Sequence, residues 1–322
     1  MENINRITKI IKILFFFAVT LLIFYLIFRK VDYLSLKEVF LNAKWYYLVL
    51  AILVILLAPV FSAKKWQTIL KSMDYHISFR DSFKIIMAAF PASAVTPAKV
   101  GDLIRAHYLK DKVPVTQTMG AVVTERFIDI FVLASYSFAG AAFLKNELIM
   151  GISLFIIFLT PLSFLVINKI KLPPGKWQQR IENFLYVSKI FISRPQKLLP
   201  VLFFTVIFWS VNIFEAKILF LALGVDVPLF YVAAAFPLAI FIGLLPITMA
   251  GMGTRDSAII YLFSPFGSAS ASLGAGLLYS LFAYWFLALL GLPIMKKLLW
   301  KKMKTNYPFR DSNSPGQSSE EK

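Results

Sequence analysis

The sequence has no cysteine and only two histidines, His76 and His107. The lack of cysteine excludes a disulfide framework and thiolate chemistry. Two imidazoles are too few for a histidine-based metal site of the usual kind. We therefore expect neither a bound metal nor another cofactor.

Common catalytic and nucleotide-binding motifs are also missing from the sequence. It contains no Gly-x-x-x-x-Gly-Lys-Ser/Thr phosphate loop, which argues against ATP as a direct energy source. It contains no Gly-x-Ser-x-Gly elbow and no His-Glu-x-x-His zinc helix. The loops between the apolar runs are too short to house a separate catalytic domain, so the sequence gives enzymatic activity little support.

Acidic residues are scarce, with 17 Asp and Glu against 34 Lys and Arg, a formal net charge of +17. This charge could suggest nucleic acid, but the basic residues lie beside long apolar runs, as in membrane proteins with positively charged cytoplasmic loops. Hydrophobic residues make up 59% of the chain, against about 45–50% in soluble domains. The composition predicts an all-α, polytopic protein of the cell membrane and no nucleic-acid partner.

Six apolar runs are long enough to be membrane spans, and they cover residues 13–28, 45–63, 117–143, 148–167, 198–223 and 270–295. The basic segments lie at the N-terminus, at 64–84, at 168–197 and after 295, which predicts that both termini are cytoplasmic. The segment 168–197 also has the periodicity of an amphipathic helix on the inner membrane surface. We expect a membrane domain over 1–300 and a disordered polar tail over 301–322.

Two further segments have apolar flanks but carry helix-breaking residues and charges. The first, 90–107, contains Pro91, Pro97 and Gly101, and Thr96-Pro97 is a good helix start. The second runs from Pro246 to Asp256. A continuous membrane helix does not tolerate such a mixture, so we interpret both as broken, re-entrant hairpins.

All the basic segments can be cytoplasmic only if each hairpin returns to the side of the membrane from which it entered. The first hairpin enters from inside and the second from outside. This arrangement is typical of an inverted repeat with a site near the membrane midplane. The repeat halves would be about 1–145 and 146–300. The two halves show a weak sequence similarity, called the echo below: residues 96–101 read Thr-Pro-Ala-Lys-Val-Gly, and residues 248–253 read Thr-Met-Ala-Gly-Met-Gly.

Three ionisable residues in the third span, Glu125, Arg126 and Asp129, share one helical face. Such a cluster is costly against lipid, so this face should point at protein or water. Its expected partners are Lys99 and Arg105 of the first broken segment. Asp102 and Arg105 are also spaced for an i,i+3 pair.

Helix starts, glycines and permanent cations at the two breaks predict an anion site, for which a lipid phosphate is the obvious ligand in a bilayer. The predicted binding residues are Lys99, Arg105, Arg126, Arg255, Gly101, Gly251 and Gly253. The residues expected to orient these cations are Asp102, Glu125, Asp129 and Asp256. The alternative is that the arginines only pair internally: Arg126 with Glu125 and Asp129, Arg105 with Asp102, and Arg255 with Asp256.

Glu215 lies near the middle of the fifth span, one turn after Asn212. It could carry a coupling proton, because burial disfavours the charged form of a carboxyl group. It could equally be a hydrogen-bonded polar anchor. His107 falls on the apolar side of its segment and is expected to be packed rather than catalytic.

The sequence resembles the membrane domain of the lysylphosphatidylglycerol synthases, the flippase half of the multiple peptide resistance factor proteins. The resemblance spans roughly residues 8–300, and its motifs are Pro97–Ala106, Glu125–Asp129 and Pro246–Asp256. It implies a multi-pass protein that handles phospholipids or polyprenyl-linked lipids. Asp102 and Asp256 stand where the family pattern suggests Glu. The soluble aminoacyl-transferase domain is not in this sequence, so lysine transfer from tRNA is not carried over.

The first functional hypothesis is therefore a lipid flippase that binds an anionic or phosphate-containing head group between the two breaks. One alternative is a membrane-embedded transferase acting on a lipid-linked substrate with an aminoacyl or glycosyl donor. Another is a scaffold for a separately encoded transferase. A homo-oligomer is left open.

Overall fold

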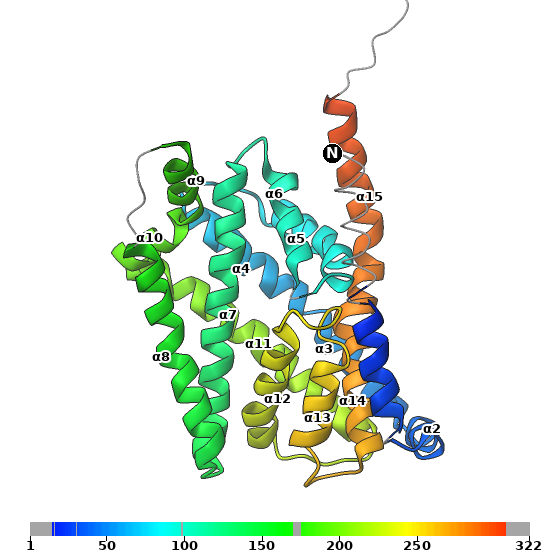
Figure 1. Cartoon of the computed structure of the whole chain (residues 1–322). Coiled ribbons are helices and arrows are strands. Elements are labelled where there is room, and N and C mark those ends of the chain that lie inside the picture. The colour runs from blue at the N-terminus through cyan, green and yellow to red at the C-terminus, as the bar shows by residue number, and fades with distance from the viewer. Residues whose placement is uncertain (1–14, 16, 30, 98, 170–174, 307–322) are drawn as a thin grey trace, which may run out of the picture.

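The protein is built from helices, and five of them are long and apolar enough to cross a membrane (Figure 1). The computed structural model describes residues 15, 17–29, 31–97, 99–169 and 175–306; within these ranges no β-strand is present. The five candidate spans are Trp45–Ser72, Val115–Phe143, Glu147–Ile167, Pro195–Ala222 and Ala269–Trp300. Two shorter apolar helices are Phe17–Arg29 and Leu229–Leu244. The predicted all-α, multi-pass class is confirmed.

The span that begins at Trp45 is longer than its sequence predicts. It consists of α3 (Trp45–Ile55) and α4 (Ala58–Ser72). Pro59 lies in the first turn of α4, where its missing N–H leaves no helical hydrogen bond unmade. The expectation that a basic loop begins at Lys64 is therefore wrong, and Lys65 lies in a buried helical position instead.

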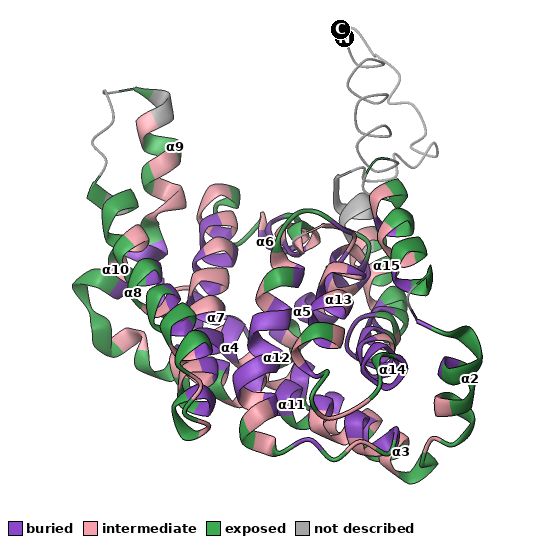
Figure 2. Cartoon of the chain, turned by 60° about the horizontal axis from the view of Figure 1, so that its bottom comes forward, coloured by how far each residue is buried: buried purple, intermediate pink, exposed green. Residues whose placement is uncertain are grey.

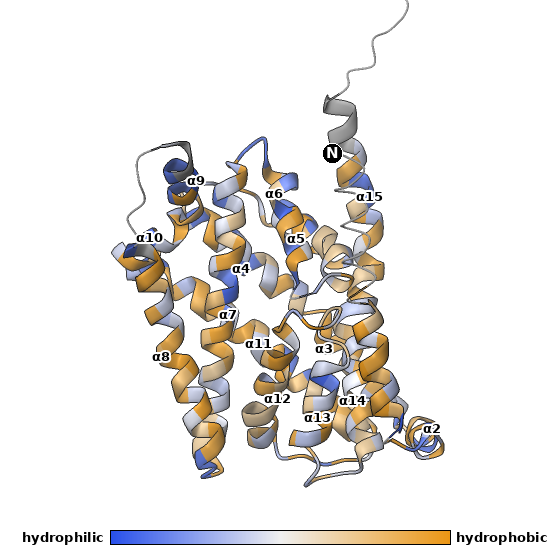
Figure 3. Ribbon diagram, in the orientation of Figure 1, coloured by the Kyte–Doolittle hydropathy of each residue, from blue (hydrophilic) through white to orange (hydrophobic). Residues whose placement is uncertain are grey.

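Other predicted spans agree with the observed helices. They are α7 (Val115–Phe143), α8 (Glu147–Lys169) and α11 (Leu199–Ala222). The last span combines α14 (Ala269–Ser280), a π-helical turn (Leu281–Phe286) and α15 (Leu287–Asn306). Apolar side chains on α8 such as Phe155 and Phe158 are about two-thirds exposed, at 65% and 67%, and the ribbon of this helix is mostly orange, the colour of hydrophobic residues, in Figure 3. This pattern is typical of a lipid-facing helix.

Shorter helices cap the ends of the bundle. They are α2 (Tyr33–Leu41), α9 (Lys176–Phe184), α10 (Tyr186–Ser193) and a 3₁₀ turn (Pro195–Lys197). The single amphipathic helix predicted in 168–197 is thus two helices. Within the predicted first span and tail, residues 13, 14, 16 and 307–322 lie outside the described residues.

Both segments predicted to be interrupted are interrupted. In the first, α5 (Phe79–Ala94) ends before a break at 95–99, which a 3₁₀ turn (Val100–Leu103) and α6 (Ile104–Leu109) follow. In the second, α12 (Leu229–Leu244) and α13 (Thr254–Leu262) flank a break at 245–253. In Figure 1, α5 and α6 lie in the upper half of the molecule, and α12 and α13 lie in the lower half.

The chain around each break repeats the same order of features. Two residues after the end of the helix before it, α4 or α11, comes a residue with positive φ, Asp74 (64°) or Gly224 (79°). Equivalent backbone hydrogen bonds close both turns, Tyr75 N to Leu70 O and Val225 N to Phe220 O. The next helix then carries Ala-Ala-Phe-Pro, at 88–91 in α5 and at 234–237 in α12.

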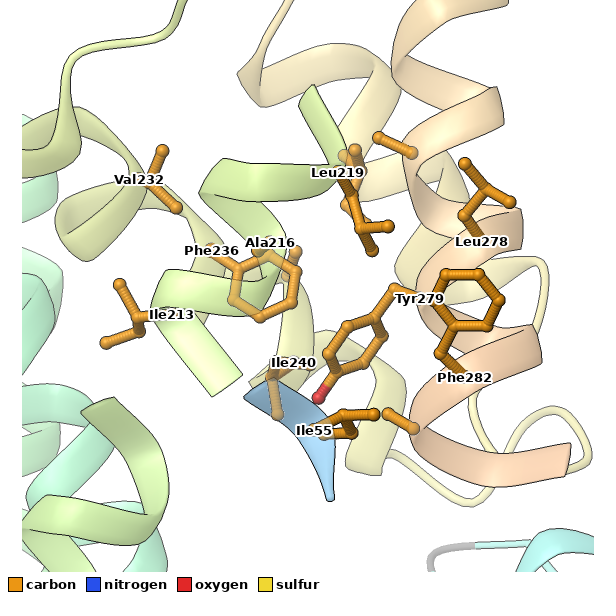
Figure 4. Close-up of a cluster of buried hydrophobic side chains, with 14 of the residues drawn as sticks. Ile55, Ile213, Ala216, Leu219, Val232, Phe236, Ile240, Leu278, Tyr279 and Phe282 are labelled. Atoms are coloured by element: carbon orange, nitrogen blue, oxygen red, sulfur yellow. The ribbon is translucent and has the colours of Figure 1, made fainter. Parts of the chain in front are cut away.

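The main apolar core lies where α11, α12 and α14 meet, and Figure 2 shows the buried residues concentrated there. Figure 4 shows its centre, in which Tyr279 is surrounded by Phe236, Ile240, Ile55 and Phe282. A second core gathers residues of α4, α5, α6 and α7. The first core includes residues beside both breaks, Ala94 and Ala250.

Candidate functional site

A buried network of six charged side chains joins α4, the first broken segment and α7. Lys65 Nζ lies 2.8 Å from Glu125 Oε1 and 2.8 Å from Asp129 Oδ1. Arg105 Nη1 lies 2.6 Å from Glu125 Oε2 and its Nη2 lies 3.2 Å from Asp102 Oδ1. The face of α7 predicted to carry these charges therefore points into the protein, toward Arg105 as expected.

Arg126 closes this network. Its Nη2 lies 3.1 Å from Asp102 Oδ2, and its Nη1 lies 3.1 Å from Asp129 Oδ2. Ser93 donates a hydrogen bond to Asp102 at 2.5 Å, and Trp209 Nε1 donates one to Asp129 at 3.1 Å. Three carboxylates thus face three cations, which is how a buried charge cluster remains stable.

The internal pairs that the sequence offered as an alternative to an anion site are all present. Arg126 also lies 3.3 Å from Glu125, and Arg255 lies 3.3 Å from Asp256. The arginines are therefore largely neutralised by their own carboxylates. Any surplus positive charge must come from another residue.

Lys99 supplies that surplus. It has no carboxylate ion-pair partner within the described parts of the chain, and its Nζ lies 4.6 Å from the centre of the Tyr284 ring. Its backbone is left-handed, with φ at 56°. In the echo between 96–101 and 248–253, Lys99 corresponds to Gly251, whose φ is 73°. A lysine therefore occupies a conformation that glycine adopts at much lower energetic cost.

The local structure of the first break differs in one respect from the prediction. Thr96 Oγ1 accepts a hydrogen bond from Gly101 N at 2.8 Å, so Thr96 caps this turn as expected. The helix nevertheless starts as a 3₁₀ turn at Val100, with Lys99 in the N-cap position, rather than at Pro97. This later start places the Lys99 side chain beside the network.

At the second break, Arg255 and Asp256 are both buried. Asp256 Oδ2 accepts a hydrogen bond from Gly253 N at 2.9 Å, and Arg255 Nη2 donates to Ser280 Oγ. The Arg255 guanidinium lies 5.0 Å from the centre of the Tyr279 ring and 5.1 Å from that of Tyr284. Tyr284 therefore contacts Lys99 of one break and Arg255 of the other.

The two breaks also touch through their backbones. Pro97 and Met249 form an isolated antiparallel bridge, and Ala250 N donates a hydrogen bond to Thr96 O at 3.3 Å. The hydroxyl of Thr20, in the helix Phe17–Arg29, accepts a hydrogen bond from Met249 N at 3.0 Å. Segments about 150 residues apart are thus brought together at one place.

A cavity of about 40 Å³ lies beside the first break and the charged network. Besides the charged residues Lys65, Lys99, Asp102, Arg105 and Arg126, its lining includes Phe208 and Tyr284. A space of this size holds a few water molecules at most. The pocket is therefore closed to a larger ligand in this conformation.

The three glycines predicted to admit a ligand approach the chain's own atoms. A Cβ on Gly101 would lie 2.3 Å from the carbonyl carbon of Ala92, and one on Gly251 would lie 2.4 Å from Gly243 O. A Cβ on Gly253 would lie 2.9 Å from Ile23. These contacts let the two breaks fold tightly against neighbouring segments.

Several features of the site are not predicted by the sequence. Lys65 falls in a segment expected to be a loop, although it lies on the same helical stripe as Trp66 and Ile69, all three of them buried. Tyr284 and Trp209 carry no distinguishing local signal. The expectation that His107 is packed is wrong, because its side chain is exposed and α6 turns Arg105 and Tyr108 inward instead.

The chain is similar to known membrane proteins. A family model described as the lysylphosphatidylglycerol synthase TM region matches residues 10–291. A UPF0104 membrane protein of Methanocaldococcus jannaschii is 26% identical over 300 residues, covering 82% of this chain and 89% of the relative. A second one from the same organism is 27% identical over 216 residues, covering 62% and 90%. One from Methanothermobacter thermautotrophicus is 20% identical over 282 residues, covering 76% and 83%.

Proposed function

Because the chain belongs to the family of the lysylphosphatidylglycerol synthase TM region, we propose that it moves lipids between membrane leaflets. The phosphate of a phospholipid or polyprenyl-linked lipid would bind in the cavity beside the first break, which Tyr284 connects to Arg255, while the acyl or prenyl chains stay in the bilayer. The protein would lie in the cell membrane with both termini in the cytoplasm, since α9, α10 and the end of α15 share the end of the molecule that carries basic segments (Figure 1).

The observation that carries this proposal is the surplus charge of Lys99. Four cations line the cavity, Lys65, Lys99, Arg105 and Arg126, and the network provides only three carboxylates, Asp102, Glu125 and Asp129. One positive charge therefore remains for an anion. A strained backbone at a non-glycine residue is often retained for function. The left-handed backbone of Lys99 brings its side chain to the cavity.

Repeated features around the breaks support an inverted repeat. The antiparallel bridge joins Pro97 to Met249, which are equivalent positions in the echo between 96–101 and 248–253. A two-fold axis that relates the halves would pass between these residues. Inverted repeats alternate access by moving one half relative to the other around a central site. The small cavity then corresponds to a closed state, and a head group enters when the two breaks separate.

Lys99 variants provide the first test. We expect Lys99→Gly to keep the fold, because glycine adopts φ near 56° without strain, and to reduce lipid movement at least about tenfold, as the loss of a charged contact worth about 1.5–3 kcal/mol predicts. Lys99→Gln should behave similarly. The assay measures movement of fluorescent phospholipids and polyprenyl phosphates in reconstituted vesicles.

Lys112→Gln is the matched control, because it removes a positive charge from an exposed turn. Its rate should equal that of the wild type. Wild-type vesicles that move no lipid class faster than empty ones refute the proposal. A new lipid product formed when membranes are given activated donors would instead favour the transferase alternative.

A crosslink between the two breaks tests whether they must separate for lipid to move. The chain lacks native cysteines, so the pair Pro97→Cys and Met249→Cys can be oxidised without competing reactions. Paired positions in an antiparallel bridge have Cα atoms about 4.5–5.5 Å apart, within the range for a disulfide. We expect the crosslink to stop lipid movement and a reductant to restore it. Unchanged movement in the fully crosslinked protein would show that the breaks need not separate.

A further inference from the structure

Lys65 and Glu215 lie at equivalent positions in the two halves of the chain. Lys65 lies nine residues before the positive-φ residue Asp74, and Glu215 lies nine residues before Gly224 (74 − 65 = 224 − 215). Both side chains are buried, with exposures of 1% and 0%. The two halves thus place an ionisable group at the same buried position, a base in one and an acid in the other.

The two groups differ in their partners. Lys65 contacts two carboxylates, whereas neither carboxyl oxygen of Glu215 has a hydrogen-bond partner among the described residues. Asn212, one turn earlier, makes its hydrogen bonds elsewhere: its Oδ1 accepts one from the Tyr279 hydroxyl at 2.9 Å, and its amide donates one to Phe208 O. Glu215 is therefore not the hydrogen-bonded anchor that the sequence offered as one alternative.

The cation of this region is Arg255 of α13, whose guanidinium lies 5.0 Å from the centre of the Tyr279 ring, and the Tyr279 hydroxyl bonds to Asn212, one turn before Glu215. Arg255 is also incompletely bonded, since its Nε and Nη1 have no hydrogen-bond partner in the described chain. The other titratable groups around Arg255 are Asp256 of α13, Tyr279 of α14 and Tyr284 of the π-helical turn. Figure 4 shows apolar side chains of α3 and α12, Ile55, Phe236 and Ile240, around Tyr279.

A buried carboxyl group in such surroundings is stable only when it holds a proton or when a cation reaches it. We propose that Glu215 is a proton-binding site that alternates between these two conditions during transport, an inference that rests on the proposed lipid movement. In the closed state Glu215 is the neutral acid, and Arg255 pairs with Asp256. When Glu215 releases its proton to water on the side where the protein opens, the unbonded Nε and Nη1 of Arg255 turn toward the new carboxylate, so that one guanidinium serves both Glu215 and Asp256.

This exchange connects the proton to the lipid site. Arg255 contacts Tyr284, which also contacts Lys99, so movement of the guanidinium alters the wall of the head-group cavity. Arg255 also follows directly on the second break, where Arg255 N donates a hydrogen bond to Gly251 O at 2.9 Å. A shift of the guanidinium toward Glu215 would weaken its pair with Asp256 and loosen the break that bridges to Pro97.

The first arm of the test does not require transport. Infrared spectra of the purified protein in deuterated buffer should contain a band of a protonated carboxylic acid that persists above about pH 7, where exposed carboxyl groups are ionised. Glu215→Gln, which copies the neutral form, should fold and lose this band. Glu147→Gln, the same substitution at an exposed helix start, should keep it. If Glu215→Gln does not fold, Glu215→Asp should shift the band.

The second arm measures coupling in vesicles with a pH difference of one unit. If one proton moves with each lipid, the steady-state ratio of labelled lipid between leaflets should shift by up to about tenfold for the wild type and not at all for Glu215→Gln. A missing band overturns the proton site whether or not lipid moves. A band with no response of lipid movement to pH overturns the coupling. If no lipid moves at all, the proposed function fails, and the infrared arm still decides whether Glu215 holds a proton.

Discussion

Lys65→Met is expected to destabilise the protein by about 3–5 kcal/mol, because it leaves two buried carboxylates with one cation too few. Lys65 is 1% exposed and lies 2.8 Å from both Glu125 and Asp129. Without it, the remaining network holds three carboxylates and only Arg105 and Arg126. The effect is measured as the shift in the unfolding transition of the purified protein in detergent.

The control is Lys64→Met, the same substitution one residue earlier on a less buried face, and it should change stability little. The double variant Lys65→Met with Asp129→Asn restores equal numbers of opposite charges, and the introduced amide oxygen can still accept the hydrogen bond from Trp209. It should recover most of the lost stability. A double variant as unstable as Lys65→Met would show that Lys65 acts through packing rather than charge.

Gly251→Ala should have the second large effect. Its φ of 73° is left-handed, which costs a residue with a Cβ about 1–2 kcal/mol. The new methyl carbon would also lie 2.4 Å from Gly243 O, so the break would have to move away from α12. We expect a loss of at least about 2 kcal/mol of stability, with the bridge between Pro97 and Met249 disturbed, measured by thermal unfolding and by the cysteine crosslink.

Gly151→Ala gives a control of opposite sign. Gly151 lies in α8, and no atom is within 4 Å of the position that its Cβ would occupy. Alanine stabilises a helix interior by about 0.5–1 kcal/mol relative to glycine. Equal effects of the two substitutions would contradict the tight packing inferred at the second break.

Much of the candidate site was predictable from short-range patterns. The shared face of Glu125, Arg126 and Asp129 follows from the helical repeat, and the cost of charges in lipid predicts that this face points inward. The pairing of Asp102 with Arg105 follows from i,i+3 spacing. The breaks at 95–99 and 245–253 follow from proline and glycine.

The burial of Lys65 cannot be predicted from such short-range patterns. A Lys-Lys pair at the end of an apolar run normally indicates a cytoplasmic boundary, and the residues that make this lysine internal, Glu125 and Asp129, lie 60 and 64 positions further along the chain. The role of Tyr284 cannot be predicted either, because the residues next to it in the sequence do not indicate that two cations from different breaks will contact its ring.

The membrane class, the positions of the main apolar helices and the two places where helices stop can all be inferred from the amino-acid sequence. These features depend on hydrophobic runs, on the helical repeat and on the backbone limits of proline and glycine, which all act within a few residues. The three-dimensional arrangement was needed to see that the two breaks meet, that Lys65 completes the network, and that Glu215 has no hydrogen-bond partner in the described chain. Those outcomes depend on which distant groups share a buried space, where each charge is stabilised only by the partners that packing brings to it.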